Sequence, residues 1–167
     1  FTVCPAKGEE VTTKTLPCDI VCELAHQKAF EIAKAQKAPC YVIGADTIVA
    51  FENRILGKPK DNADAVRMVS MLQGNTHQVY TGVTLIEVCA DGSLREKSFY
   101  EETNVHVCQM TKDEIASYVA TGEPLDKAGA YGIQGTFSIY VSGIEGDYFN
   151  VVGLPVSRLY HEFAAFQ

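Results

Sequence analysis

The chain has 167 residues, of which 47% are hydrophobic and 21% are charged, and its formal net charge is −7. This length suits one domain with a sizeable buried core, and this composition argues against a disordered chain. No apolar run reaches the roughly 20 residues that a membrane-spanning helix needs, and no lysine and arginine cluster offers a surface for a nucleic acid polymer. We therefore expect one α/β domain over residues 1–167, in the cytoplasm, with neither a membrane nor a nucleic acid as partner.

The beginning of the chain predicts a short strand and then a helix. Phe1 and Val3 alternate with polar residues as in a strand, and because the chain starts without Met, we expect that a segment precedes this strand. Residues 19–38 have the apolar spacing of a helix, with Asp19 as its N-cap. Lys28 falls near the middle of the apolar arc, where an ammonium group needs either a partner or a path to solvent along its own stem.

A continuous apolar run over residues 40–45 predicts a strand that is covered on both faces, and hence a mostly parallel central sheet. Asp46 and Thr47 follow at the end of this run. Ligands of open α/β sheets bind beyond the carboxyl ends of the strands, so Asp46 is a candidate site residue. The alternative is an aspartate that only fixes a turn.

The rest of the chain alternates between short helices and strands. It predicts, in order, a hairpin turn at Glu52-Asn53, a helix from Asp61, a long antiparallel hairpin of residues 76–88 and 95–108, a helix capped by Thr111, a strand at 137–144 and a helix after Pro155. The six cysteines lack CxxC pairs and are interpreted as buried free thiols. His77 and His106 lie in alternating strands and are interpreted as structural.

Several charged side chains could form a site if the fold brings them together. Carboxylates accompanied by lysines, without Cys and His at zinc spacing, suit a hard cation such as Mg²⁺ that is shared with phosphate oxygens. Each lysine taken alone is an ordinary surface group. The candidates are Glu9, Glu10, Lys28, Asp46, Lys58, Asp126, Lys127 and Gln134.

Five blocks of sequence carry a family resemblance. They are "GADTIV" (44–49), "LGKP" (56–59), "HQVYTGV" (77–83), "GEPLDKAGAYGIQG" (122–135) and "NVVGLP" (150–155). In this order and spacing they resemble the Maf family of nucleoside triphosphate pyrophosphatases. The fourth block is similar to the branch that acts on dTTP and UTP, and differs from the branch that acts on 7-methyl-GTP.

The resemblance implies a fold, an activity and a cofactor. The fold is inosine triphosphate pyrophosphatase-like: α/β, a mixed sheet with flanking helices and a long antiparallel hairpin, usually as a homodimer. The activity is hydrolysis of dTTP, UTP and modified pyrimidine triphosphates to a nucleoside monophosphate and pyrophosphate. The cofactor is a divalent cation, Mg²⁺ or Mn²⁺.

The resemblance also assigns roles to residues. It makes Asp46 and Glu10 catalytic and metal-binding, with Glu9 as an alternative to Glu10 because the register there is open by one position. It makes Lys28 and Lys58 phosphate contacts. The remaining substrate-binding residues are Thr47, Lys127 and Gln134.

One family feature has no match in this sequence. Members of the family begin with a strand that leads to an S-x-S-P-R-R segment, and no such segment occurs in residues 1–167. We therefore expect a Maf-like domain without that strand and without its phosphate-binding arginines. The alternative to an active pyrophosphatase is a catalytically impaired nucleotide-binding protein, or a regulator of septum formation and cell division.

Overall fold

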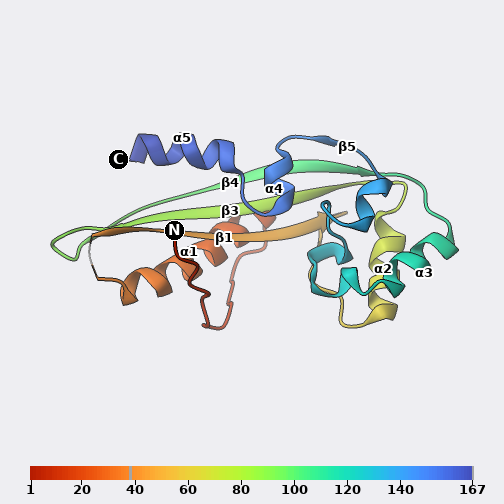
Figure 1. The fold of residues 1–167 in the computed structure, drawn as a ribbon, viewed down its shortest axis with the longest axis horizontal. Coiled ribbons are helices and arrows are strands. Elements are labelled where there is room, and N and C mark those ends of the chain that lie inside the picture. The colour runs from red at the N-terminus through yellow and green to blue at the C-terminus, as the bar shows by residue number, and fades with distance from the viewer. Residues whose placement is uncertain (38, 167) are drawn as a thin grey trace.

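A computed structural model describes residues 1–37 and 39–166. Its centre is a five-stranded antiparallel sheet with helices on both faces (Figure 1). The strands are β1 (Cys40–Phe51), β2 (Arg54–Leu56), β3 (Thr76–Val88), β4 (Leu94–Val107) and β5 (Val141–Glu145), in the order β2-β1-β3-β4-β5. The helices are α1 (Pro17–Ala35), α2 (Asn62–Leu72), α3 (Lys112–Ala120), α4 (Tyr148–Val152) and α5 (Val156–Phe166). Three short 3₁₀ segments are η1 (Glu123–Asp126), η2 (Ala128–Ala130) and η3 (Thr136–Tyr140).

All strand pairs in the described residues are antiparallel, so the expectations of a mostly parallel sheet and of a mixed sheet were wrong. The apolar run that suggested it is only half covered, because the side chains of Tyr41 and Ile43 are 43% and 48% exposed. The hairpin between β1 and β2 is confirmed. Glu52 and Asn53 both have positive φ angles, as tight turns between antiparallel strands require.

Two glycines let α1 lie directly on the sheet. Gly82 of β3 contacts the backbone of α1 directly, and a Cβ atom there would overlap the backbone carbonyl of Val21. A Cβ atom on Gly44 of β1 would lie 2.6 Å from the carbonyl oxygen of Ala25. The helix backbone therefore approaches the strands more closely than ordinary side chains would allow, which fixes where its polar residues meet β1.

The remaining helices cover the other face and one end of the sheet. α5 packs on the face opposite α1, against Val83, Leu85 and Phe99 (Figure 1). At the end of the strands farther from α5, α2, α3 and the 3₁₀ segments enclose the largest apolar cluster, around Val79 and Phe137. Strands β1, β3 and β4 therefore contribute side chains to the apolar clusters at both ends of the sheet.

Most helix caps and hairpins formed where the sequence predicted them. The long β3–β4 hairpin, the Asp61 cap of α2 and the capping box of Thr111 and Glu114 are confirmed. The strand expected at 137–144 begins only at Val141, because residues 136–140 form η3. α1 begins at Pro17, which suits the first helical turn, so Asp19 lies inside the helix and not at its cap.

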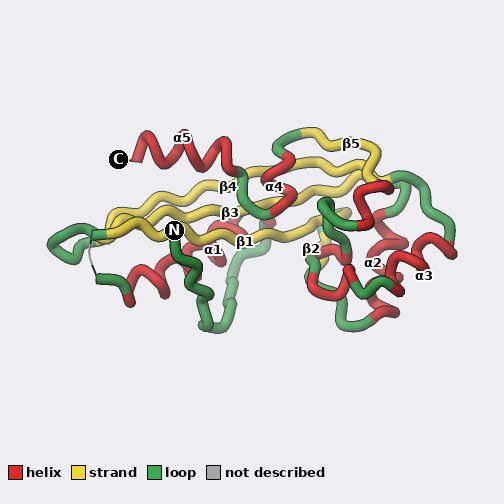
Figure 2. The backbone as a smooth tube through the Cα atoms, in the orientation of Figure 1, coloured by secondary structure: helices red, strands yellow, loops and turns green. Residues whose placement is uncertain are grey.

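The start of the chain and the burial of the cysteines differ from what the sequence predicted. Residues 1–15 contain no helix or strand, so the strand predicted at Phe1–Val3 was wrong; this segment is drawn as loop in Figure 2. The six cysteines are free thiols, as expected, but each is exposed or half-buried and none is buried. Within the described residues, no helix is both long and apolar enough to cross a membrane.

Candidate functional site

Asp46 lies in the middle of β1, and not at the end of a strand as the sequence suggested. It pairs with Gly82 of β3, so its side chain emerges on the face that α1 covers. Only 11% of the side chain is exposed. An acid in this position needs a partner, and α1 supplies it.

The partner is Lys28, whose ammonium group lies between two carboxylates. The Nζ atom of Lys28 is 2.5 Å from Oδ1 of Asp46 and 2.9 Å from Oε1 of Glu10. We call these three residues the Lys28 cluster. The lysine that looked misplaced on the apolar arc of α1 is thus paired, and two carboxylates converge on one position for a cation.

The electrostatics of the cluster reflect burial as well as pairing. Burial raises the pKa of Asp46 above its usual value, although the contact with Lys28 works against this effect. Burial alone would lower the pKa of Lys28, but the contacts with Asp46 and Glu10 outweigh it and hold this pKa above its usual value. Lys28 therefore stays charged at neutral pH.

Glu10 reaches the cluster from the loop that precedes α1. The residues Lys7–Thr13, which we call the strap, lie beside α1 and place Glu10 over Lys28. The adjacent Glu9 lines a small cavity next to the cluster but makes no ion pair within the described part of the chain. Of the two glutamates that the sequence left open, Glu10 is the one that contacts Lys28.

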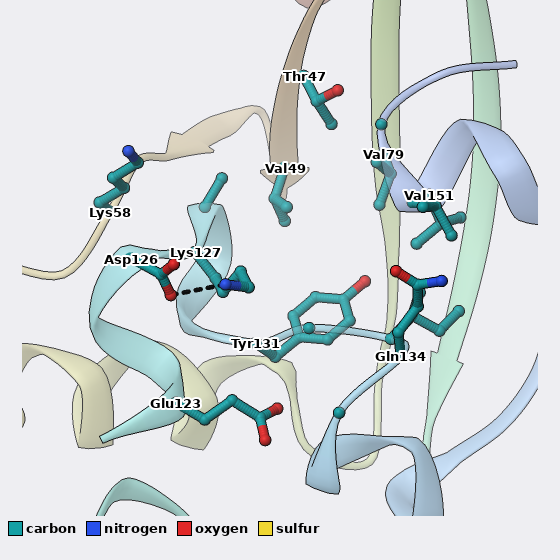
Figure 3. Close-up of a pocket in the computed structure, with 16 residues that line it drawn as sticks. Thr47, Val49, Lys58, Val79, Glu123, Asp126, Lys127, Tyr131, Gln134 and Val151 are labelled. Atoms are coloured by element: carbon teal, nitrogen blue, oxygen red, sulfur yellow. Dashed lines mark hydrogen bonds and ion pairs between the residues drawn. The ribbon is translucent and has the colours of Figure 1, made fainter. Parts of the chain in front are cut away.

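The other candidate residues lie around a larger cavity of about 500 Å³ (Figure 3). Thr47, Lys58, Lys127 and Gln134 all line it. Thr47 follows Asp46 in β1, so the two side chains point to opposite faces of the strand. The structure therefore divides the predicted site residues into two groups, one on each side of β1.

Lys58 is electrostatically linked to both groups. It lines the cavity, and its charge lowers the pKa of both Asp46 and Asp126, although burial has the larger effect on Asp46 and the contact with Lys127 has the larger effect on Asp126. Asp126 also accepts a hydrogen bond of 2.6 Å from the Nζ atom of Lys127 (Figure 3). Lys58 therefore combines a place on the cavity wall with an electrostatic effect on Asp46 in the Lys28 cluster.

Glu123 shapes the glycine-rich wall of the cavity. Its carboxylate accepts hydrogen bonds from the backbone N–H of Thr136, at 2.8 Å, and from the hydroxyl of Tyr118, at 3.2 Å. Gly135 packs so closely against this carboxylate that a Cβ atom would overlap it. The loop that carries Gln134 is thereby folded around Glu123, which the sequence analysis did not single out.

A buried polar network forms the opposite wall, and sequence patterns did not reveal it. The hydroxyl groups of Thr47 and Thr81 are 2.8 Å apart, and the Thr81 hydroxyl donates to the carbonyl of Asn150 at 2.9 Å. The side-chain amide of Asn150, which is fully buried, donates to the carbonyl of Val79 at 3.0 Å. These bonds fix α4 and the following Gly153 beside Thr47. The sequence drew attention to this segment only through the "NVVGLP" block of the family resemblance, which contains Asn150 and Gly153.

The described residues offer few ligands for a metal ion. Across residues 1–37 and 39–166, no three His, Cys, Asp or Glu side chains gather as a metal-binding group. What the structure does bring together is a pair of carboxylates, Asp46 and Glu10, around a single cation. That set suits an ion that keeps most of its water ligands, as Mg²⁺ does.

A five-stranded antiparallel sheet with flanking helices, a cavity lined by polar and apolar side chains, and a carboxylate-lysine cluster define a small α/β protein with a candidate ligand site. Residues 1–166 match the model of the family described as "Maf: Maf-like protein". The chain belongs to the Maf family.

Similar proteins are found in several bacteria. A protein of Agathobacter rectalis named dTTP/UTP pyrophosphatase is 54% identical, over 97% of this chain and 85% of that protein. A protein of Lachnoclostridium phytofermentans with the same name is 49% identical, over 99% of this chain and 84% of that protein. A third, from Bacillus cytotoxicus, is 49% identical, over 95% of this chain and 80% of that protein.

Proposed function

We propose that this chain hydrolyses dTTP, UTP and modified pyrimidine triphosphates to a nucleoside monophosphate and pyrophosphate. Membership of the Maf family and the names of the similar bacterial proteins support this activity. The observation that carries it in the structure is the convergence of Asp46 and Glu10 on one cation position, the ammonium group of Lys28. Lys58, which lines the cavity, adds a further positive charge. The proposal includes the inosine triphosphate pyrophosphatase-like fold and the homodimer that the resemblance implies.

Asp46 and Glu10 are the residues that would hold a divalent cation. Mg²⁺ is commonly bound through one or two carboxylates together with substrate phosphates and retained waters. When bound, such an ion neutralises phosphate charge and supplies an activated water. The two carboxylates fit this role because they already share one cation, the ammonium group of Lys28, at 2.5 and 2.9 Å.

The lysines supply the remaining positive charge. Phosphoryl transfer depends mainly on positioning and on neutralising the phosphate oxygens, so cations are needed along the triphosphate. Lys28 and Lys58 take this role, Lys28 beside the carboxylates and Lys58 at the edge of the cavity. The contacts with Asp46 and Glu10 raise the pKa of Lys28, so its ammonium group stays protonated throughout the neutral range.

The cavity receives the nucleoside. Its walls carry Thr47, Lys127 and Gln134, which offer a hydroxyl, an ammonium and an amide for polar contacts with a base and a sugar. Val49, Val79 and Val151 supply apolar surface in the same cavity (Figure 3). A small number of polar groups among apolar walls is typical of sites for small organic ligands.

The test is pyrophosphate release from UTP, dTTP, CTP and ATP in the presence of Mg²⁺. We expect release from UTP and dTTP well above the other two, and a loss of at least about 100-fold in Asp46→Asn. Asp91→Asn, in the exposed β3–β4 turn, is the matched control and should keep full activity. Inactivity with every nucleotide, or full activity in Asp46→Asn, would refute the proposal; saturable binding without turnover in calorimetry would favour the impaired nucleotide-binding protein.

A further inference from the structure

The strap, residues Lys7–Thr13, is held on α1 by polar contacts. Its backbone N–H groups at Lys7 and Gly8 donate to the two carboxylate oxygens of Glu31, at 2.9 and 3.0 Å. Further along, the N–H of Val11 donates to Oε1 of Gln27 at 3.2 Å, and Nε2 of Gln27 donates back to the carbonyl of Val11.

The last contact lies at the start of the helix. There Glu23 accepts hydrogen bonds from the Thr12 hydroxyl at 2.6 Å and from the Thr13 N–H at 3.3 Å. As the strap advances from residue 7 to residue 13, its partners on α1 go from 31 to 23. The strap therefore runs antiparallel to the helix.

The three partners on α1 are regularly spaced. Glu23, Gln27 and Glu31 are four residues apart, so they form one row along the helix surface. This spacing has a direct effect on the site, because Lys28 follows Gln27 in the chain. The hydrogen bond between Gln27 and Val11 is therefore next to the ion pair between Lys28 and Glu10.

Burial does not explain why the strap lies where it does. Its residues 7–13 are all exposed, so little apolar surface is removed from water when it docks. Ordering a loop costs conformational entropy, which some contact must offset. The hydrogen bonds to Glu23, Gln27 and Glu31, together with the Glu10–Lys28 ion pair, are the contacts available for this.

We propose that Glu23, Gln27 and Glu31 are positioning residues that dock the strap and so deliver Glu10 to the Lys28 cluster, which sets the affinity of the chain for the divalent cation. This inference rests on the proposed function, because it takes Glu10 as a ligand of the cation. It goes beyond that function by assigning the position of this ligand to a row of side chains that lie outside the Lys28 cluster.

The variant that tests the inference is Gln27→Met, which keeps the length and the charge of the side chain but removes both hydrogen bonds to Val11. Gln36→Met is the matched control, because Gln36 is exposed at the end of the same helix and lies beyond the strap. Mn²⁺ alone is the probe, and its binding is measured from the electron paramagnetic resonance signal of the free ion. Hydrogen exchange of the amides of residues 7–13 reports docking of the strap.

We expect faster exchange in the strap and Mn²⁺ binding that is about tenfold weaker in Gln27→Met, with no change in Gln36→Met. In a Glu10→Gln background, Gln27→Met should weaken Mn²⁺ binding no further, because the effect acts through Glu10. In pyrophosphate release from UTP, the Mg²⁺ concentration for half-maximal rate should rise about tenfold, while kcat at saturating Mg²⁺ stays within about twofold. A merely structural role would lower kcat without this shift.

The outcomes separate this inference from the proposed function. Exchange and Mn²⁺ binding need no turnover, so a chain that shows both changes but releases no pyrophosphate would refute only the proposed activity. Unchanged exchange, or unchanged Mn²⁺ affinity despite faster exchange, would overturn the role of the row. A parent chain that binds no Mn²⁺ would overturn it as well.

Discussion

The ammonium group of Lys28 in α1 lies 2.5 Å from the carboxylate of Asp46 in β1, at a place where the helix backbone rests on two glycines of the sheet. The contact is more than a surface ion pair, because the side chain of Asp46 is almost fully covered and Glu10 adds a second carboxylate. Removing the lysine would leave two acids facing one another without a cation.

Replacing Lys28 with methionine should therefore destabilise the protein in a pH-dependent way. Without the ammonium group the pKa of Asp46, already raised by burial, rises further above its unfolded value. The stability is then fully present only below the unfolded pKa of Asp46, and it is lost as pH rises from there through the folded pKa. We expect Lys28→Met to lose about 1–3 kcal/mol at pH 7, and much less near pH 4, in urea unfolding. An equal loss at both pH values would contradict this account.

Replacing Gly82 with alanine should push α1 off the sheet. The added methyl group would overlap the carbonyl of Val21, which belongs to the helix backbone and cannot rotate away. Overpacking of this kind costs about 1–3 kcal/mol in the free energy of unfolding. Gly57→Ala is the control, because nothing lies within 4 Å of a Cβ atom there, and it should change stability by less than about 0.5 kcal/mol. Equal stability of the two variants would show that α1 has room to move.

His77 should make the protein sensitive to mild acid. Its imidazole is fully buried against the Tyr131 hydroxyl, 2.7 Å from Nε2, and burial lowers the pKa of His77 to about 4. The structural role expected for this histidine agrees with these contacts. As pH falls below the unfolded value of about 6.5, the unfolded chain takes up a proton that the folded chain refuses until about pH 4.

Stability should therefore fall by about 2 kcal/mol between pH 7 and pH 4.5 on account of this residue alone. His77→Gln has no titrating group at the position and should lack this part of the loss, whatever its stability at neutral pH. The measurement is urea unfolding of both proteins at the two pH values. Parallel pH profiles for the parent and the variant would show that His77 is not the sensitive group.

Lys58 should matter for turnover while a neighbouring lysine does not. Both Lys58 and Lys60 are exposed, but Lys58 lines the cavity and acts electrostatically on Asp46. A charge-assisted phosphate contact is worth roughly 1.5–3 kcal/mol, so Lys58→Ala should lower kcat/KM for UTP by about 10- to 150-fold. Lys60→Ala should stay within about twofold of the parent. Similar losses in the two variants would point to a general effect of surface charge.

Features encoded within a few residues could be predicted from the sequence. The capping box at Thr111, the cap at Asp61 and the turn at Glu52-Asn53 depend only on near neighbours, and all three form as expected. The position of Lys28 on the apolar arc of α1 also indicated that it needed a partner. These signals survive because the physics that produces them is local.

Features that depend on distant pairing could not be predicted in the same way. An apolar run such as residues 40–45 fits a parallel or an antiparallel strand, and only its partners decide which one forms. Because the sequence suggested that Asp46 follows the end of a strand, it did not predict that Asp46 and Thr47 point to opposite faces of β1. Asn150 gave no signal of its own, because its partners Val79 and Thr81 lie about seventy residues earlier in the chain.

The strands that contribute side chains to several apolar clusters also affect how the molecule unfolds. β3 gives Ile86 and Val88 to the cluster under α1, Val83 and Leu85 to the cluster under α5, and Val79 to the large cluster at the far end. Unfolding at one end of the sheet would remove packing partners from the apolar cluster at the other end, because one continuous ladder of hydrogen bonds spans both ends. We therefore expect the chain to denature in a single all-or-none step, with tyrosine fluorescence and far-ultraviolet circular dichroism reporting coincident midpoints.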